Sequence, residues 1–442
     1  MADRIAAIET LCLELPYKKP VHFHSVTEDA GKYVLLRIFT KDGAEGIAEC
    51  ISRMPQTGDT PATIIKAIET HFSPALLGGD PLGRAGLIQR CGGVLDAACR
   101  AALGLVDVAL LDLEGKLRGM PAWKVLGGTV TPPPVPVTWI VHGNTVAEQV
   151  AEAEKAIYET GFSALKLKTW KRSLEDVDMV RAVRAAVGDD CIIWVDANGS
   201  YLEDEARAIL SQLEKYGVSF IEDPCAPSDL DSMAALARDL PIPVLGDEIT
   251  GNFEDAEKLV QGHGVGGVSV KLRRTGIIES LKIIDMAEKS GVPVTIGTDS
   301  ESRIGALARI HLRAACSHLA PWPTETHFFH KLARDVFDGE FIFEKGAIKV
   351  PDGPGIGASI DLKKLEERRL KPGLFLVLSC AAGLYFTPHH RQKDLMVIVE
   401  VKNDLCPEVC LHDIIEFNFR DFKTNKFSVG DLVLMIAPDS DP

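Results

Sequence analysis

The chain has 442 residues, of which 46% are hydrophobic and 25% are charged, and its formal net charge is -15. This balance is typical of a globular protein with a large core and excludes a disordered chain. The negative charge argues against nucleic acid and anionic membranes as partners, since both need a basic face, and it favours a small-molecule partner.

No apolar run reaches membrane-spanning length, and the N-terminal residues lack the pattern of a signal peptide. The ten cysteines are scattered along the chain, which is typical of reduced thiols, so we expect a cytoplasmic protein. Cys406 and Cys410 form a CxxxC pattern, but no second pair or nearby histidine completes a zinc set.

The first part of the chain predicts a three-stranded sheet followed by helices. Polar and apolar residues alternate over residues 9–16, 32–43 and 46–52, and Asp42 and Gly43 mark a hairpin turn. From Thr60 to Lys116 the apolar period becomes helical, with one stripe formed by Ala98, Ala101, Ala102, Leu105, Val108, Ala109 and Leu113. We therefore expect an α+β capping domain over residues 1–125.

Four prolines, at positions 132, 133, 134 and 136, predict a rigid connector. Beyond it, short apolar runs alternate with amphipathic helices. The first of these helices is expected to begin at a capping box formed by Thr145 and Glu148 and to end at Gly161. The runs cover residues 136–141, 164–168, 191–198, 219–224, 243–248, 267–272 and 293–300, with a weak last member at 321–325.

Strands that alternate with helices predict a parallel sheet, and eight such units close a barrel. The predicted fold is α/β, a (β/α)7-8 TIM-type barrel over residues 126–330. Residues 331–368 are expected to complete the capping domain. Residues 369–442 form an extension of unassigned fold, whose short apolar runs are compatible with a small β domain.

Ionisable side chains and one amide follow successive strands of this predicted barrel. A closed parallel barrel brings all such ends to one rim, where barrel enzymes keep their chemistry. The set consists of Lys166, Lys168, Asp196, Asn198, Glu222, Asp247, Lys271, Asp299 and Glu301.

Three acidic side chains in this set, Asp196, Glu222 and Asp247, end consecutive strands. Carboxylates that meet at a desolvated rim repel each other unless a cation lies between them. Oxygen ligands without histidine or cysteine favour a hard ion, so we expect magnesium, with manganese as the alternative. The other interpretation is three unrelated strand-end acids.

Alternation along the second strand turns Lys166 and Lys168 to the same face, into the barrel. Our hypothesis is that Lys166 and the metal prepare Lys168 as a base, because both disfavour a further positive charge. Lys271 approaches from almost the opposite side. Two acid-base groups on opposite faces of a substrate suit proton removal and return at one carbon.

These motifs resemble the enolase superfamily and, within it, the muconate lactonizing enzyme subgroup of mandelate racemase-like proteins. The resemblance covers roughly residues 5–365 and rests on the motifs KLK, DAN, EDP, GDE, SVKL, GTDSES and PDGPGIG. It implies that Asp196, Glu222 and Asp247 bind magnesium, that Lys168 and Lys271 are the catalytic lysines, and that several copies assemble into a homo-oligomer.

The resemblance also implies abstraction of a proton α to a substrate carboxylate through a stabilised enolate. We expect an isomerase, either a racemase or epimerase of an amino-acid derivative or a muconate-type cycloisomerase. Dehydration of a β-hydroxy acid such as a hydroxyproline uses the same intermediate. A non-catalytic barrel with a binding role is the alternative of another class.

Substrate contacts are expected from the capping-domain loops and from the last barrel strands. His22 and His24 are candidates, with solvated loop residues as the alternative. Trp322 is expected to stack on a cationic group of the substrate, with help from Asp299. The alternative is a core tryptophan at the barrel closure. The same two interpretations apply to Trp139. Asn198 and Glu301 complete the candidate substrate-binding set.

Overall fold

The structure is a computed structural model. It describes residues 3–370 apart from 24–25, 54–56, 93–96, 263, 317–318 and 320–321, together with Leu378–Ser379 and Val399–Glu400. Residues Met1–Arg369 form one compact unit, and Leu370–Pro442 form a second. In the second unit, β16 (Leu378–Ser379) pairs in parallel with β17 (Val399–Glu400). The other residues of the expected extension, Cys406 and Cys410 among them, lie outside the described residues.

The N-terminal sheet has the predicted three strands. β1 (Ile5–His22), β2 (Thr27–Thr40) and β3 (Glu45–Ile51) pair antiparallel in that order. The turn at Asp42 and Gly43 is confirmed, with Gly43 in the left-handed region at φ 89°. β1 is longer than predicted because it continues past Pro16, where its register with β2 shifts before pairing resumes at Val21.

Helices follow this sheet, as expected. They are α2 (Pro61–Ala67), α3 (Ser73–Leu76), α4 (Arg84–Arg90), the long α5 (Ala97–Arg118) and α6 (Ala122–Val125), with a π-helical turn at Ile68–Phe72. The apolar stripe predicted for α5 is buried from Ala101 to Leu113. Apolar burial of this kind contributes about 25 cal/mol per Å², so the stripe fixes α5 in the core.

Helix α5 also connects the capping region to the barrel. A side chain at Gly104 would lie 2.3 Å from the carbonyl oxygen of Leu272, so only glycine allows this approach. Asp107, also on α5, accepts hydrogen bonds from the backbone N–H groups of Ile277 and Ile278, both at 2.7 Å. The residue after Lys271 is thus in direct contact with α5.

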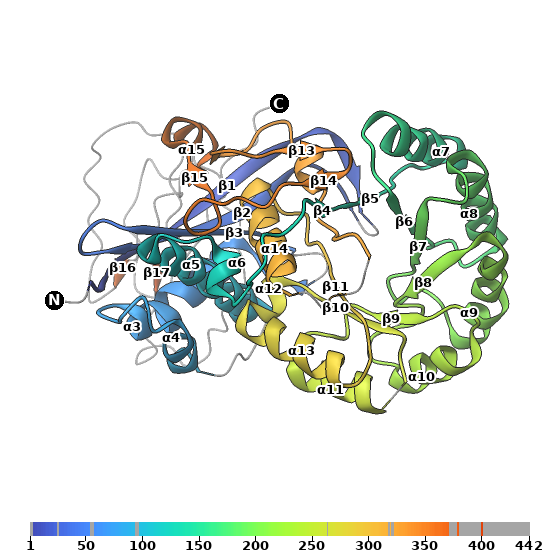
Figure 1. Ribbon diagram of the computed structural model, residues 1–442, viewed down its shortest axis with the longest axis horizontal. Coiled ribbons are helices and arrows are strands. Elements are labelled where there is room, and N and C mark those ends of the chain that lie inside the picture. The colour runs from blue at the N-terminus through green and yellow to red at the C-terminus, as the bar shows by residue number, and fades with distance from the viewer. Residues whose placement is uncertain are drawn as a thin grey trace, which may run out of the picture. The chain divides into compact units, whose positions relative to one another are not determined.

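The barrel strands form a seven-stranded parallel sheet in sequential order, which confirms the predicted α/β fold class. Figure 1 shows these strands curving around a common axis with their helices outside. The strands are β5 (Thr138–Ile140), β6 (Ala164–Lys168), β7 (Ile192–Asp196), β8 (Val218–Glu222), β9 (Val244–Gly246), β10 (Gly267–Val270) and β11 (Val294–Ile296).

The connecting helices are α7 (Val146–Glu154), α8 (Leu174–Val187), α9 (Glu203–Leu210), α10 (Leu230–Asp239), α11 (Phe253–Gly262), α12 (Leu272–Thr275), α13 (Ile278–Lys289) and α14 (Arg303–Ala315). A π-helical turn (Lys155–Glu159) extends α7, and a 3₁₀ turn (Ser211–Tyr216) extends α9. The capping box of Thr145 and Glu148 is confirmed, and Gly161 has the left-handed backbone that ends a helix.

The weak eighth member is not a regular strand. Instead, residues 324–325 connect the two ends of the sheet. The Thr138 N–H donates to the carbonyl of Thr324 at 3.0 Å, and the Glu325 N–H donates to the carbonyl of Ile296 in β11, also at 3.0 Å. A segment this short has no periodicity of its own, yet its backbone closes the ring.

The expected proline connector is partly a strand. β4 (Val135–Pro136) pairs with β14 (Ala347–Ile348), which pairs with β13 (Phe343–Glu344). Pro136 is tolerated there because β4 is an edge strand.

The segment after the barrel returns to the capping sheet. The Ala333 N–H donates to the Pro16 carbonyl of β1 at 2.8 Å, and Leu13 forms a bridge with Arg369. The remaining elements are a 3₁₀ turn (Phe328–His330), the pair β12 (Phe337–Asp338) and β15 (Ser359–Ile360), and α15 (Leu362–Arg368).

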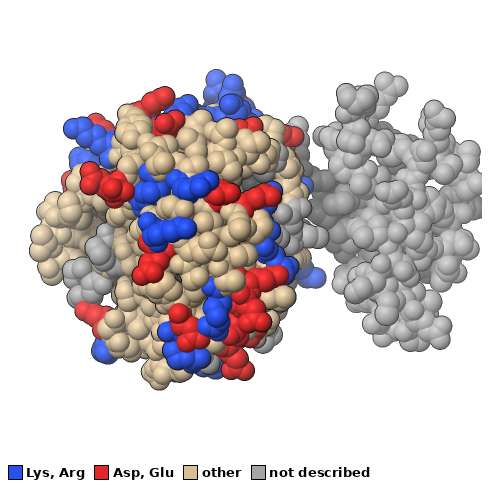
Figure 2. All heavy atoms as spheres, turned by 90° about the vertical axis from the view of Figure 1, so that its right-hand side faces the viewer, with Lys and Arg blue, Asp and Glu red and all other residues tan. Residues whose placement is uncertain are grey.

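The outer face of the barrel carries both signs of charge. Figure 2 shows acidic and basic side chains intermixed on this face. On α9, Arg207 forms ion pairs with Glu203 and Asp239. Among the described residues, no helix combines the length and the apolar character needed to cross a bilayer.

Candidate active site

Strand β6 directs two lysines into the barrel. In the parallel ladder, Lys166 lies opposite Trp194 of β7 and Lys168 lies opposite Asp196. Lys166 is the deeper of the two, with a side chain that is 3% exposed against 19% for Lys168. The predicted shared orientation of the two lysines is confirmed.

Lys166 lies among carboxylates. Its Nζ donates to Glu222 at 2.7 Å and to Glu325 at 3.0 Å, and it forms an ion pair with Asp196 at 3.0 Å. Burial alone would lower the pKa of Lys166, but these negative charges outweigh burial and raise that pKa well above its ordinary value. The amine of Lys166 is thus surrounded by carboxylates from three different segments of the barrel.

Lys168 is at the mouth of the site. Its Nζ lies 2.6 Å from Oδ2 of Asp196 and 2.8 Å from Oδ1 of Asn198, and that same amide oxygen accepts from Trp170 Nε1 at 3.1 Å. Burial would raise the pKa of Asp196, but the ammonium groups of Lys166 and Lys168 lower it to about 2.

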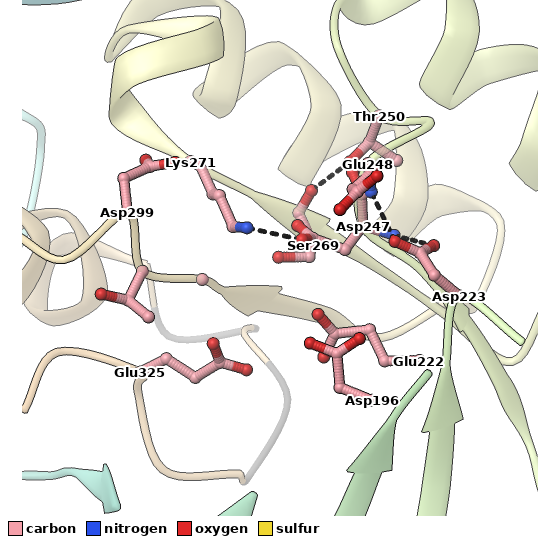
Figure 3. A network of polar contacts seen from close by, with 12 residues as sticks. Asp196, Glu222, Asp223, Asp247, Glu248, Thr250, Ser269, Lys271, Asp299 and Glu325 are labelled. Carbon is pink, nitrogen blue, oxygen red and sulfur yellow. Dashed lines mark hydrogen bonds and ion pairs between the residues drawn. The ribbon is translucent and has the colours of Figure 1, made fainter. Parts of the chain in front are cut away.

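Lys271 follows β10 and contacts the third predicted acid. Its Nζ lies 2.5 Å from Oδ2 of Asp247, while Arg274 binds the other oxygen of that carboxylate at 2.6 Å. Burial opposes ionisation of Asp247, yet Arg274 and Lys271 hold its pKa well below the ordinary range. Figure 3 shows the lysine side chain reaching toward Asp247.

The two candidate catalytic lysines lie on opposite sides of the ring. β6 and β10 are four strands apart through β7, β8 and β9. The other way round, through β5, residues 324–325 and β11, the separation is also four steps. The amines can thus approach one carbon from two faces.

The three predicted metal ligands are buried, each about 1% exposed. Figure 3 shows Glu222 beside Asp196, with Asp247 farther along the same rim. Within the described part of the chain, no three histidine, cysteine, aspartate or glutamate side chains are arranged as a metal cluster. The lysine ammonium groups contact these carboxylates instead.

The donor set nevertheless fits a hard divalent cation. All its ligand atoms are carboxylate oxygens, and Oε2 of Glu222 is buried without a hydrogen-bond partner. Burial and the charge of Asp196 raise the pKa of Glu222 well above its ordinary value. A cation at this carboxylate would satisfy the unpartnered oxygen and offset the repulsion.

Left-handed backbone conformations cluster at this rim. Asn198, Asp223 and Ser300 all have positive φ, at 44°, 40° and 77°, and each follows a barrel strand closely. Such conformations cost about 1–3 kcal/mol each and concentrate at functional sites. Asp223 also accepts hydrogen bonds from the N–H groups of Asp247 and Glu248, both at 2.8 Å, and so fixes the end of β9.

Asp299 and Glu301 both pair with Arg309 of α14, at 3.0 and 2.5 Å. Burial opposes ionisation of Asp299, but Lys271 and Arg309 lower its pKa. The two acids line a pocket together with Glu49 of β3 and Arg273. Figure 3 shows Asp299 near Lys271, and the contacts of Asp299 and Glu301 with substrate stay predictions.

Trp322 packs inside the barrel against Phe220, with ring centroids 4.6 Å apart, and Phe220 stacks on Trp194. This packing matches the core interpretation of Trp322. Trp139 packs against Phe162 and donates to Glu152 of α7. His24 and the side chain of His22 lie outside the described residues.

Glu325 is the residue that the sequence analysis missed. It is 1% exposed, and its carboxylate binds Lys166. Glu325 is the last residue of the weak eighth member (321–325), so the expectation that functional side chains lie at the ends of barrel strands, which identified Asp196 and Glu222, could have found it.

Comparison with known proteins gives two family-model matches. Residues 7–127 match the mandelate racemase / muconate lactonizing enzyme N-terminal domain, and residues 148–364 match the enolase C-terminal domain-like model. Muconate cycloisomerase 1 of Acinetobacter baylyi is 27% identical over 82% of this chain and 99% of that protein. L-Ala-D/L-Glu epimerase of Bacillus subtilis is also 27% identical, over 80% of this chain and 96% of that protein.

Solved structures show the same similarity. The muconate lactonizing enzyme of Pseudomonas fluorescens, complexed with muconolactone, matches with a TM-score of 0.78 and 27% identity, over 84% of this chain and 100% of that chain. The Bacillus subtilis epimerase in a substrate-liganded complex matches with a TM-score of 0.75 and 27% identity, over 80% of this chain and 98% of that chain.

Proposed function

The chain belongs to the enolase superfamily and to its muconate lactonizing enzyme subgroup, and on that premise we propose that it abstracts the proton α to a substrate carboxylate. The named relatives are cycloisomerases and an epimerase, and this chain is an isomerase of the same superfamily. The observation that carries the proposal is the pair of amines, Lys168 and Lys271, facing each other across a ring of buried acids.

Lys168 is the proposed base. Its amine takes the α-proton, the C–H bond breaks, and the electron pair moves into the carboxylate to give an enolate. Asn198 orients this amine through its amide oxygen, which Trp170 also binds. In a racemase or epimerase, Lys271 then delivers a proton to the opposite face of the same carbon.

The enolate carries a second negative charge on the substrate carboxylate. A divalent cation, Mg²⁺ or alternatively Mn²⁺, held by Asp196, Glu222 and Asp247 would supply positive charge that offsets it. Lys166 lies on the same side, where its amine pairs with Asp196, Glu222 and Glu325.

Two substrate classes remain within the proposal. The cycloisomerase and the epimerase share the same identity with this chain, 27%, so sequence identity does not separate a muconate-type acid from an amino-acid derivative as the substrate. A cytoplasmic location, suggested by the scattered cysteines, and assembly into a homo-oligomer belong to the same proposal.

Incubation in deuterium oxide with Mg²⁺ tests it directly. The panel contains both enantiomers of amino acids, dipeptides and N-acyl amino acids, together with hydroxyprolines and cis,cis-muconate, each followed by mass spectrometry and proton NMR. We expect one class to gain a single deuterium at the α-carbon, and Glu222→Gln to abolish the gain. Absence of exchange from every acid, with metal bound, would contradict the proposal.

A further inference from the structure

Gly297 occupies a position where no side chain fits. It follows β11 directly and is buried beneath the side chain of Lys271. A Cβ at this position would lie 2.7 Å from Cε of Lys271 and 2.7 Å from Oγ of Ser269. Figure 3 shows Ser269 of β10 and Lys271, which directly follows that strand.

The backbone at Gly297 does not require glycine. Gly297 is not among the residues with left-handed φ, so alanine can adopt its conformation without strain. Glycine is therefore needed at this position only because it leaves room, and that room is filled by the aliphatic part of the Lys271 side chain, a candidate catalytic amine.

The backbone also has little freedom to withdraw. The Gly297 N–H donates to the carbonyl of Val270 at 2.9 Å, and its carbonyl accepts from Nε of Arg309 at 3.0 Å. Arg309 is itself 4% exposed and paired with Asp299 and Glu301. A methyl group added here must be accommodated by the side chains it meets, Lys271 and Ser269, rather than by the strand.

We propose that Gly297 is a positioning residue for Lys271, because its lack of a side chain lets the lysine stem lie against the backbone just after β11 and sets where the amine meets the substrate. This inference rests on the proposed function and adds to it a determinant of the Lys271 half-reaction. Lys168 is the last residue of β6, four strands away from β10 on the opposite side of the ring.

Gly297→Ala gives a quantitative expectation. Ordinary contacts begin near 3.4 Å, whereas the new methyl would lie at 2.7 Å, so Cε must move by at least about 0.7 Å. A displacement of about 1 Å at a catalytic group costs roughly 10²-fold in rate. We expect a loss of about ten- to a hundredfold, confined to the half-reaction that Lys271 performs.

The first readout is α-deuterium exchange for each enantiomer of the accepted substrate. The exchange that Lys271→Ala abolishes should fall in kcat in Gly297→Ala, while exchange of the other enantiomer keeps its wild-type rate. Equal slowing of both, or of neither, would overturn the proposal. Gly86→Ala in α4 is the matched control, since a Cβ there meets no atom within 4 Å.

The second readout does not depend on the substrate. Limited acetylation with acetic anhydride, followed by peptide mass mapping, compares the labelling of Lys271 with that of Lys168, whose side chains are 14% and 19% exposed. In Gly297→Ala the Lys271 to Lys168 ratio should rise several-fold, because the displaced amine leaves Asp247. An unchanged labelling ratio would overturn the proposed role of Gly297, whether or not any acid on the panel exchanges. Absence of exchange from every acid would overturn only the proposed function.

Ser269→Ala combined with Gly297→Ala separates the two crowded neighbours. Ser269 Oγ has no hydrogen-bond partner, so removing it relieves the contact with the new methyl group at little cost in stability. The double variant should also fold more readily than Gly297→Ala alone. The double variant should stay impaired in the Lys271 half-reaction. Full recovery would show that Ser269, not Lys271, is the group displaced, and would overturn the proposal.

Discussion

Replacing Asp59 by asparagine removes one charge from a buried ion pair between the capping region and the barrel. Asp59 pairs with Arg273, two residues beyond Lys271, and their side chains are 0% and 4% exposed. Arg273 also donates to the carbonyl of Ile51 at 3.1 Å and to the hydroxyl of Thr57 at 3.2 Å. Asparagine keeps the shape of Asp59 and an oxygen for the Arg53 N–H, so the change removes mainly charge.

The expected loss is large because a guanidinium is left buried. Burial already lowers the pKa of Arg273, and breaking a buried pair typically costs about 3–5 kcal/mol. The entropy of unfolding is about 2.1 cal/mol/K per residue. Over the 369 residues of the first unit, this corresponds to a fall in Tm of about 4–6 °C.

Differential scanning calorimetry of Asp59→Asn, Arg273→Met and the double variant, at one scan rate, measures the pair. Removing both charges is often nearly neutral, so the double variant should be more stable than either single variant. If Asp59→Asn stays within about 0.5 kcal/mol of wild type, or if the two losses simply add, the reasoning is refuted.

Three further changes test other parts of the account. Burial and the charge of Glu301 raise the pKa of Glu49 from 4.5 to about 8. The stability that the protonated Glu49 contributes to the fold is therefore complete below about pH 4.5 and is lost as pH rises toward 8. Between about pH 6 and pH 9 the Tm of wild type should fall more than the Tm of Glu49→Gln, and an equal fall of both Tm values would contradict this. Glu222→Gln should weaken Mg²⁺ binding, measured by titration calorimetry, by more than roughly tenfold, and an unchanged affinity would remove Glu222 from the ligand set. A chain that ends at Arg369 should keep the Tm and the α-deuterium exchange rate of the full chain, because the first unit is compact and covers almost the whole length of its relatives. A lower Tm of the shortened chain would show that the second unit stabilises the first.

Much of the fold follows from local patterns. The capping box at Thr145, the apolar stripe of α5 and the alternating β6 are each encoded within a few neighbouring residues. Parallel closure then brings the ends of distant strands to one rim, which is why Asp196, Glu222 and Lys271 could be placed at that rim without coordinates, while their roles stay predictions.

The features that the sequence did not predict depend on distant partners. β4 is a strand only because β14 pairs with Pro136 and Val135, and residues 324–325 close the ring through two backbone hydrogen bonds. Trp322 could be assigned to the core only once Phe220 was found against it. The role of Gly297 likewise depends on a lysine 26 positions earlier in the chain.

We propose that the two lysine amines exchange protons with one α-carbon from opposite faces. Lys168→Ala and Lys271→Ala, each incubated in deuterium oxide with both enantiomers of the acid that the wild type deuterates, test it most directly. The account predicts reciprocal losses, with each variant failing on one enantiomer and retaining exchange on the other. Equal loss of both enantiomers in both variants, or exchange that survives in each, would contradict it.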